Sequence, residues 1–244
     1  FPNPRGLWPH PFKGGRKMRR MFLMAAVLTL VAGQALAVTT IKGTKHDLSS
    51  TNASTGINIK SDNYEEICIF CHTPHKAVDQ LNAPLWNRSG TDSISISRYY
   101  NSATLDPESR QTTVSPKIAV SDVKLCLSCH DGASLTKDLA NPSNLENGVQ
   151  PTGLVELGSV TVPQTAPANI GVDLHDDHPI GMVYADIVSN NSDEWVANPV
   201  ASIKFYDGGV MWCSSCHDVH DNTAGPFLVT SNSASGLCLS CHNK

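Results

Sequence analysis

All eight cysteines of the chain occur in one short pattern, C-x-x-C-H, which is present four times. The pattern places two thiols about one helical turn apart and an imidazole directly after them. This is the attachment sequence of c-type haem, in which the thiols bond to the porphyrin and the histidine binds the iron. The four motifs are Cys68, Cys71 and His72; Cys126, Cys129 and His130; Cys213, Cys216 and His217; and Cys238, Cys241 and His242. We therefore expect four covalently bound haems.

Zinc sites, thioredoxin-like dithiols and disulfide frameworks also use C-x-x-C pairs. A histidine follows every pair, although only 10 of the 244 residues are histidine, so chance is a poor explanation. Zinc ribbons separate their pairs by about 15–20 residues. The first three motifs start 58 and 87 residues apart, and no cysteine is left over for a catalytic nucleophile. The pattern favours haem over these alternatives.

The second ligand of each iron decides what a haem does. With two histidines the iron has no open position and exchanges electrons, whereas an iron with one protein ligand can bind a small molecule. An internal repeat selects the candidates, because each half of the chain contains a histidine, then C-x-x-C-H-x-x-H, then L-C-L-S-C-H. The second ligands predicted from the repeat are His46, His75, His178 and His220. His175 is left over, although it is followed by Asp as His46 is and is an alternative to His178.

The spacing of His72 and His75, repeated in His217 and His220, puts two imidazoles on one face of a helical turn, so we expect neighbouring haems to lie close together. Met182 and Met211 could serve two irons at most, and we expect them to pack against porphyrin.

We interpret the acidic stretch 173–177 as a solvated loop rather than a metal site. With no convincing acid, base or nucleophile, the sequence predicts an electron carrier without catalytic residues.

Residues 18–37 combine two arginines, a short apolar run and an Ala-x-Ala ending, as a secretory signal peptide does. We interpret residues 1–17, which precede the candidate initiators Met18 and Met21, as a non-native extension, and expect the mature chain to begin at Val38. It then holds 12 basic and 22 acidic residues, a net charge of −10 that argues against nucleic acid as a partner. We expect an exported protein without a membrane span, located outside the cell or at its surface, with the periplasm as the alternative.

The elements that carry these motifs are predicted to be short. Helical periodicity is weak, turn signals recur, and Ser and Asn are abundant. We expect mostly irregular coil with short helices and few strands, organised around the haems, with candidate strands at 93–97 and 155–162. A Pro, Gly and Asn-rich stretch near residue 150 divides the chain into two related di-haem halves, 38–150 and 151–244.

Six segments together resemble the doubled C-x-x-C-H family of multihaem c-type cytochromes. They are Lys45–Leu48, Ile67–His75, Ala83–Arg88, Cys126–Gly132, Asp177–Gly181 and Cys213–His220. Within that family the chain is similar to the tetrahaem, filament-forming OmcE-type cytochromes. The resemblance implies stacked bis-histidine haems and head-to-tail self-association, with one axial histidine donated across the interface. We expect that histidine to be His46, because it lies near the N-terminus of the mature chain.

The expected function is therefore extracellular electron transfer along a filament, between redox donors and acceptors that the sequence does not identify. A soluble periplasmic electron shuttle is the main alternative. A haem-dependent reductase of a small oxyanion is a more distant one, because it would need an iron with an open position.

Overall fold

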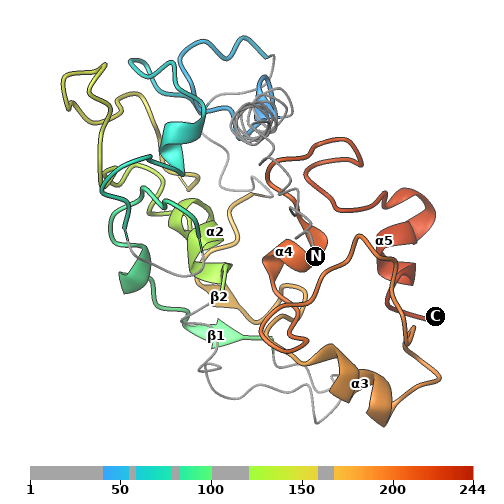
Figure 1. Cartoon of the computed structure of the whole chain (residues 1–244). Coiled ribbons are helices and arrows are strands. Elements are labelled where there is room, and N and C mark those ends of the chain that lie inside the picture. Colours follow the sequence, from blue (N-terminus) through green and yellow to red (C-terminus); the bar gives the residue numbers. More distant parts are fainter. Residues whose placement is uncertain (1–40, 55–58, 79–82, 101–120, 159–167, 244) are drawn as a thin grey trace, which may run out of the picture. The chain divides into compact units, whose positions relative to one another are not determined.

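The computed structural model describes residues 41–54, 59–78, 83–100, 121–158 and 168–243. All of them belong to one compact unit, Thr40–Lys244 (Figure 1). The predicted extension at 1–17, the signal peptide at 18–37 and the start of the mature chain at Val38 lie outside the described residues.

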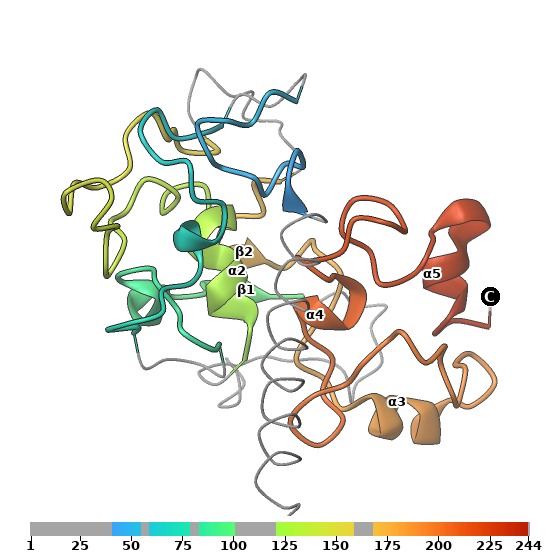
Figure 2. The ribbon, with the colours of Figure 1, turned by 45° about the horizontal axis from the view of Figure 1, so that its top comes forward.

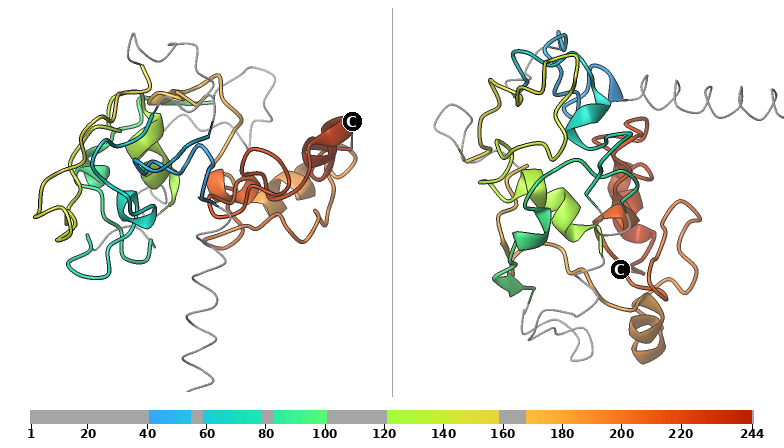
Figure 3. Two further views of the ribbon diagram at one scale, coloured as in Figure 1. Left: turned by 90° about the horizontal axis from the view of Figure 1, so that it is seen from above. Right: turned by 60° about the vertical axis from the view of Figure 1, so that its left-hand side comes forward.

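The helices are short, as the sequence predicts, and irregular chain connects them (Figure 3). Among the described residues there are four α-helices and three 3-10 turns. The helices are α2 (Val123–His130), α3 (Tyr184–Asn190), α4 (Cys213–Cys216) and α5 (Gly236–Leu239), and the 3-10 turns are η1 (Cys68–Phe70), η2 (Thr91–Ser93) and η5 (Ser233–Ser235). No helix in the described ranges is both long and apolar enough to cross a membrane.

A two-stranded parallel sheet joins β1 (Arg98–Tyr99) to β2 (Asp173–Leu174) beside α2 (Figure 1). The prediction of a strand at 93–97 was wrong. Ile94 and Ile96 are buried in alternation as in a strand, but pairing with the second segment begins only with the bond from Ser97 N–H to Val172 O, 2.7 Å long. Residues 155–158 are irregular, and the rest of the second candidate strand lies outside the described residues.

The apolar core consists of three small clusters rather than one continuous interior. The largest joins the sheet, α2 and the segment that precedes α4, and includes Leu127, Leu174 and Trp212. The second contains Tyr64, Phe70 and Leu139, and the third contains Met182, Ile187 and Met211. Small separate clusters fit the expectation that a bound group fills part of the interior.

Several contacts cross the predicted boundary near residue 150. Asp62 N–H donates to Thr152 O at 2.8 Å, and Ser214 N–H donates to the Asp122 carboxylate at 2.7 Å. The sheet also crosses this boundary, because β1 belongs to the first predicted half and β2 to the second. The division into di-haem halves at 38–150 and 151–244 stays a prediction, and these contacts tie the two halves together.

Candidate haem-attachment site

Each C-x-x-C-H motif lies on its own helical turn, in η1, α2, α4 or α5. In three of them the histidine N–H donates to the carbonyl of the first cysteine, at 2.8 Å in His72 to Cys68, 3.1 Å in His217 to Cys213 and 3.0 Å in His242 to Cys238. Figure 2 shows the turns of the last two motifs, α4 and α5, in the red part of the chain. One turn brings both thiols and the imidazole to the same side, which is the geometry that thioether attachment requires.

The four turns follow one another in space in the order of the sequence. Thiols of successive motifs are close enough for the later thiol to raise the pKa of the earlier one. The pairs are Cys71 with Cys129, Cys126 with Cys213 and Cys216 with Cys241. In the middle pair a hydrogen bond with Cys213, followed by burial, raises the pKa of Cys126 well above its usual value. The motifs thus form a connected series.

Cys71 is an exposed residue, and desolvation by the protein around it raises the pKa of its thiol to about 12. All eight cysteines are free thiols in the structure and are available for thioether bonds.

The histidines of the first two motifs are oriented by backbone carbonyls. His72 Nδ1 lies 2.8 Å from Pro84 O, and His130 Nδ1 lies 2.6 Å from Ala168 O. A carbonyl oxygen only accepts hydrogen bonds, so Nδ1 carries the proton in both rings and Nε2 keeps its lone pair. Metal-binding histidines are held in this way by their outer neighbours.

His46 is enclosed by residues of its own chain. Its ring stacks on Phe227 at 4.1 Å between ring centres and lies 6.1 Å from the ring of His130, nearly perpendicular to it. Burial, and then the charges of His130 and His217, lower the pKa of His46 to about 4. The ring is neutral near pH 7, which is the form that binds a metal. Donation of His46 to a neighbouring subunit stays an untested prediction, and these contacts argue against it.

The other three predicted second ligands are all exposed residues, and only one of them lies next to a motif histidine. His220 lies 6.1 Å from His72, ring centre to ring centre, with the planes inclined by 18°. His75 and His178 are exposed, and His178 Nδ1 bonds to Pro179 O at 3.0 Å. The structure therefore brings two of the four predicted second ligands next to motif histidines.

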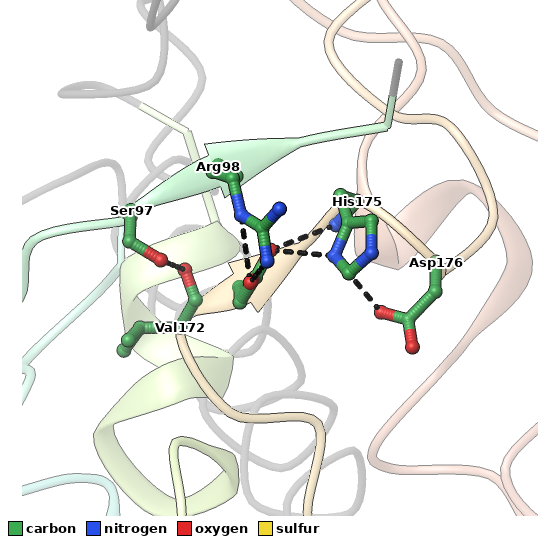
Figure 4. Close-up of polar contacts among 6 residues, drawn as sticks. Ser97, Arg98, Val172, His175 and Asp176 are labelled. Carbon is green, nitrogen blue, oxygen red and sulfur yellow. Dashed lines mark hydrogen bonds and ion pairs between the residues drawn. The ribbon is translucent and has the colours of Figure 1, made fainter. Parts of the chain in front are cut away.

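His175, the histidine that the repeat leaves over, belongs to a surface cluster beside the sheet (Figure 4). Its Nδ1 lies 2.8 Å from the Asp173 carboxylate, which also accepts from Arg98. Asp176 flanks the same ring at 3.6 Å. Asp173, at the start of the acidic stretch, is thus engaged by Arg98 and His175. No group of three or more His, Cys, Asp or Glu within the described ranges is placed to hold a metal ion.

Met182 and Met211 are buried together with Ile187, next to Trp195 and Phe205. These neighbours are protein side chains, so the structure accounts for both methionines as core residues. Trp195 in turn contacts the motif histidine His242, with the ring centres 4.3 Å apart.

Arg88 lies next to the first motif, and the sequence analysis gave it no role in haem binding. Its side chain is 1% exposed, and Nη2 donates to the carbonyls of Ser134 and Leu135 at 2.6 and 2.9 Å. Nε and Nη1 are buried without a hydrogen-bond partner, and the guanidinium is near enough to Cys71 to act on its pKa. A buried cation needs an anionic partner. Haem, which carries two propionate carboxylates, fits that requirement next to the first motif.

One comparison with known proteins bears directly on these turns. The family model for the doubled C-x-x-C-H motif matches residues 206–244, which contain the third and fourth motifs. The paired motifs support covalently bound c-type haem and a multihaem cytochrome that transfers electrons. Proteins of this kind are typically exported.

A second comparison finds pentafunctional AROM polypeptides of Saccharomyces cerevisiae, for example from strains RM11-1a and S288c. They are 31% identical over 112 residues, which is 44% of this chain and 7% of the yeast protein. The chain thus spans about 7% of the length of the curated relatives that it matches. A match over so small a part of a multifunctional protein transfers no activity to this chain.

Proposed function

We propose that this protein is an exported tetrahaem c-type cytochrome that passes electrons along a series of bis-histidine haems. The observation that carries the proposal is the spatial succession of four C-x-x-C-H turns, in which thiols of consecutive motifs are neighbours. Haem supplies a reversible one-electron couple at its iron. The protein fixes the spacing of the four sites and supplies the ligands that set their potentials.

The residues around the turns have defined roles in this proposal. Pro84 O and Ala168 O hold the Nδ1 protons of His72 and His130, so that each Nε2 faces the site. Burial keeps His46 neutral, and Arg88 brings a positive charge that can offset the charge of a propionate. None of these roles requires an acid, a base or a nucleophile. This supports electron transfer rather than reduction of a small oxyanion.

Haem content and spin state test the assignment. We expect four haems per chain by intact mass and by haem assay of the exported protein, with low-spin spectra for all four. The variant Cys238→Ala with Cys241→Ala should lose one haem, whereas the matched variant Ser231→Ala, at an exposed position, should lose none. A protein without haem would refute the proposal. A persistent high-spin iron would favour the reductase alternative.

We further propose that the protein self-associates head to tail into a conductive filament outside the cell. The exposed rings of His75 and His178 support this step, because an exposed imidazole can reach another subunit more easily than the enclosed His46. Electron cryomicroscopy of protein sheared from cells tests it. Unbranched filaments with a repeat of one chain are expected, and dispersed particles at high concentration would favour a soluble periplasmic shuttle.

A further inference from the structure

Two histidine pairs in the structure share an unusual separation. The ring centres of His46 and His130 are 6.1 Å apart, and those of His72 and His220 are also 6.1 Å apart. The planes are inclined by 76° in the first pair and by 18° in the second. Each pair combines one motif histidine with one histidine from outside the C-x-x-C-H pattern.

This separation is larger than that of a close stack of two rings. The true stack of His46 on Phe227 has ring centres 4.1 Å apart. Larger rings in the molecule touch at about 6 Å through their edges, as Tyr64 and Phe70 do at 6.0 Å. Imidazoles are smaller than these rings and come into contact at shorter centre-to-centre distances.

The distance of 6.1 Å matches the span of two imidazoles bound to one metal ion. A metal–imidazole bond is about 2 Å long, and the ring nitrogen lies about 1 Å from the ring centre, so two imidazoles on opposite sides of one metal have centres roughly 6 Å apart. Rotation about the shared axis leaves this distance unchanged. One pair can therefore be nearly coplanar and the other nearly perpendicular.

The surroundings orient the rings for this arrangement. His72 and His130 have their Nδ1 protons bonded to carbonyls, which directs the lone pair of Nε2 to ligation. His46 is held by the ring of Phe227, whose φ of +54° lies in the left-handed region that phenylalanine rarely adopts. A residue held in such a conformation is often one that positions a functional group.

We propose, resting on the proposed function, that His46 and His130 would together hold the iron of the haem on the second motif, and that His220 and His72 would hold the iron of the haem on the first. The second assignment crosses the repeat, because His220 belongs to the second half and His72 to the first. The two halves therefore share ligands and do not form independent di-haem units. His75 and His178 are left for the third and fourth motifs.

A crossed set of variants in the full haem-loaded chain tests both pairs. His46→Met and His220→Met should each shift the potential of one haem to more positive values, because methionine ligation raises the potential. His175→Met is the matched control, since its imidazole belongs to the surface cluster with Asp173, and it should shift none. The readout is a spectroelectrochemical titration that resolves the four haems.

Removal of single haems then assigns each shift. In a background without the first haem, Cys68→Ala with Cys71→Ala, the shift from His220→Met should vanish while that from His46→Met remains. In a background without the second haem, Cys126→Ala with Cys129→Ala, the opposite result is expected. A shift that persists after removal of its assigned haem would overturn that pair.

The structure of the intact haem-loaded protein gives a readout that does not depend on the folding of variants. Density that connects one iron to His46 and His130, and another to His72 and His220, is expected. Any other pairing overturns the inference while leaving a four-haem electron carrier intact. Absence of haem would instead refute the proposed function itself.

Discussion

The region before residue 150, with the first two motifs, and the region after residue 168, with the last two, differ in how many polar side chains they bury. Of the thirteen buried polar or charged side chains among the described residues, eleven precede residue 150, and only Ser215 and Ser240 follow it. Both regions bury large apolar side chains, for example Tyr64 and Phe70 in the first and Met211 and Trp212 in the second. Apolar packing thus supports the motifs in both regions, and the first region adds many buried hydrogen-bonding side chains.

The difference shows that the C-x-x-C-H motif does not determine the structure around it. Hydrogen bonds are directional and hold a backbone in one geometry, whereas apolar burial is non-directional and tolerates rearrangement. In the first region Asn87 and Arg88 bind carbonyls of segments near residues 69, 134 and 141. In the second, Trp212 packs against β2 and also against β1 and α2 of the first region. Substitutions in the two regions should therefore have different consequences.

The largest effect is expected at Trp212, in the region after residue 168. Trp212 is 2% exposed and directly precedes the third motif, so Trp212→Ala should lower the free energy of unfolding by about 3–5 kcal/mol. Trp212→Phe keeps most of the apolar area, and we expect a clearly smaller loss from it. Thermal unfolding of the haem-loaded protein, followed by circular dichroism, measures both. Equal losses would mean that the hydrogen bond from Trp212 to Asp207, rather than packing, dominates.

The next largest effect is expected at Arg88, the buried cation in the region before residue 150. Arg88→Met removes a charged donor from the carbonyls of Ser134 and Leu135, which should cost about 2–4 kcal/mol. Arg98→Met, at an arginine whose side chain is 62% exposed, is the control and should cost much less. Unfolding midpoints in denaturant compare the two. Similar midpoints for both variants would contradict the role given to Arg88.

A smaller effect is expected at Asn87, which is fully buried. Its side-chain amide donates to Ile69 O at 2.8 Å and to Asn141 O at 3.2 Å. Its side-chain oxygen accepts a hydrogen bond from Asn141 N–H at 2.8 Å. Asn87→Ala leaves these groups unpaired and should cost about 2 kcal/mol. The exposed Asn144→Ala is the matched control. Hydrogen exchange of the Asn141 amide gives a local readout, and unchanged protection there would sink the prediction.

The smallest effect is expected at the surface cluster that links the two regions. Desolvation raises the pKa of Asp173, but hydrogen bonds from Arg98 and His175 together outweigh it and hold the pKa below 3.8. The stabilisation is therefore present above pH 3.8 and is lost as the pH falls through the lowered pKa. Asp173→Asn should remove this pH dependence with little change in the melting temperature near pH 7. A large change at neutral pH would show that the cluster does more than join the exposed faces of two strands.

Much of the local structure could be predicted from the sequence, because it depends on neighbours in the chain. The four motifs form the expected helical turns, and the remainder is mostly coil. The strand position could not be predicted: Ile94 and Ile96 alternate as strand residues do, but a strand exists only where a distant segment pairs with it, here residues 173–174.

The same limit applies to the site. The histidine pattern pointed to His46, His75, His178 and His220 as ligands, but a one-dimensional pattern does not reveal which rings meet. The stack of His46 on Phe227 joins residues 181 positions apart. Arg88 ends one of the segments that carry the family resemblance, but its buried environment depends on carbonyls more than 40 residues away, so the sequence did not indicate its role.

The parallel pairing of β1 with β2 has a consequence for how the protein is made. Its partners are 75 residues apart, and closing so long a loop is slow compared with forming a helical turn. The first two motifs are complete in the chain, and their cysteines accessible, well before β2 has been synthesised. Cofactor attachment can therefore proceed on an open chain, and sheet closure comes late in maturation.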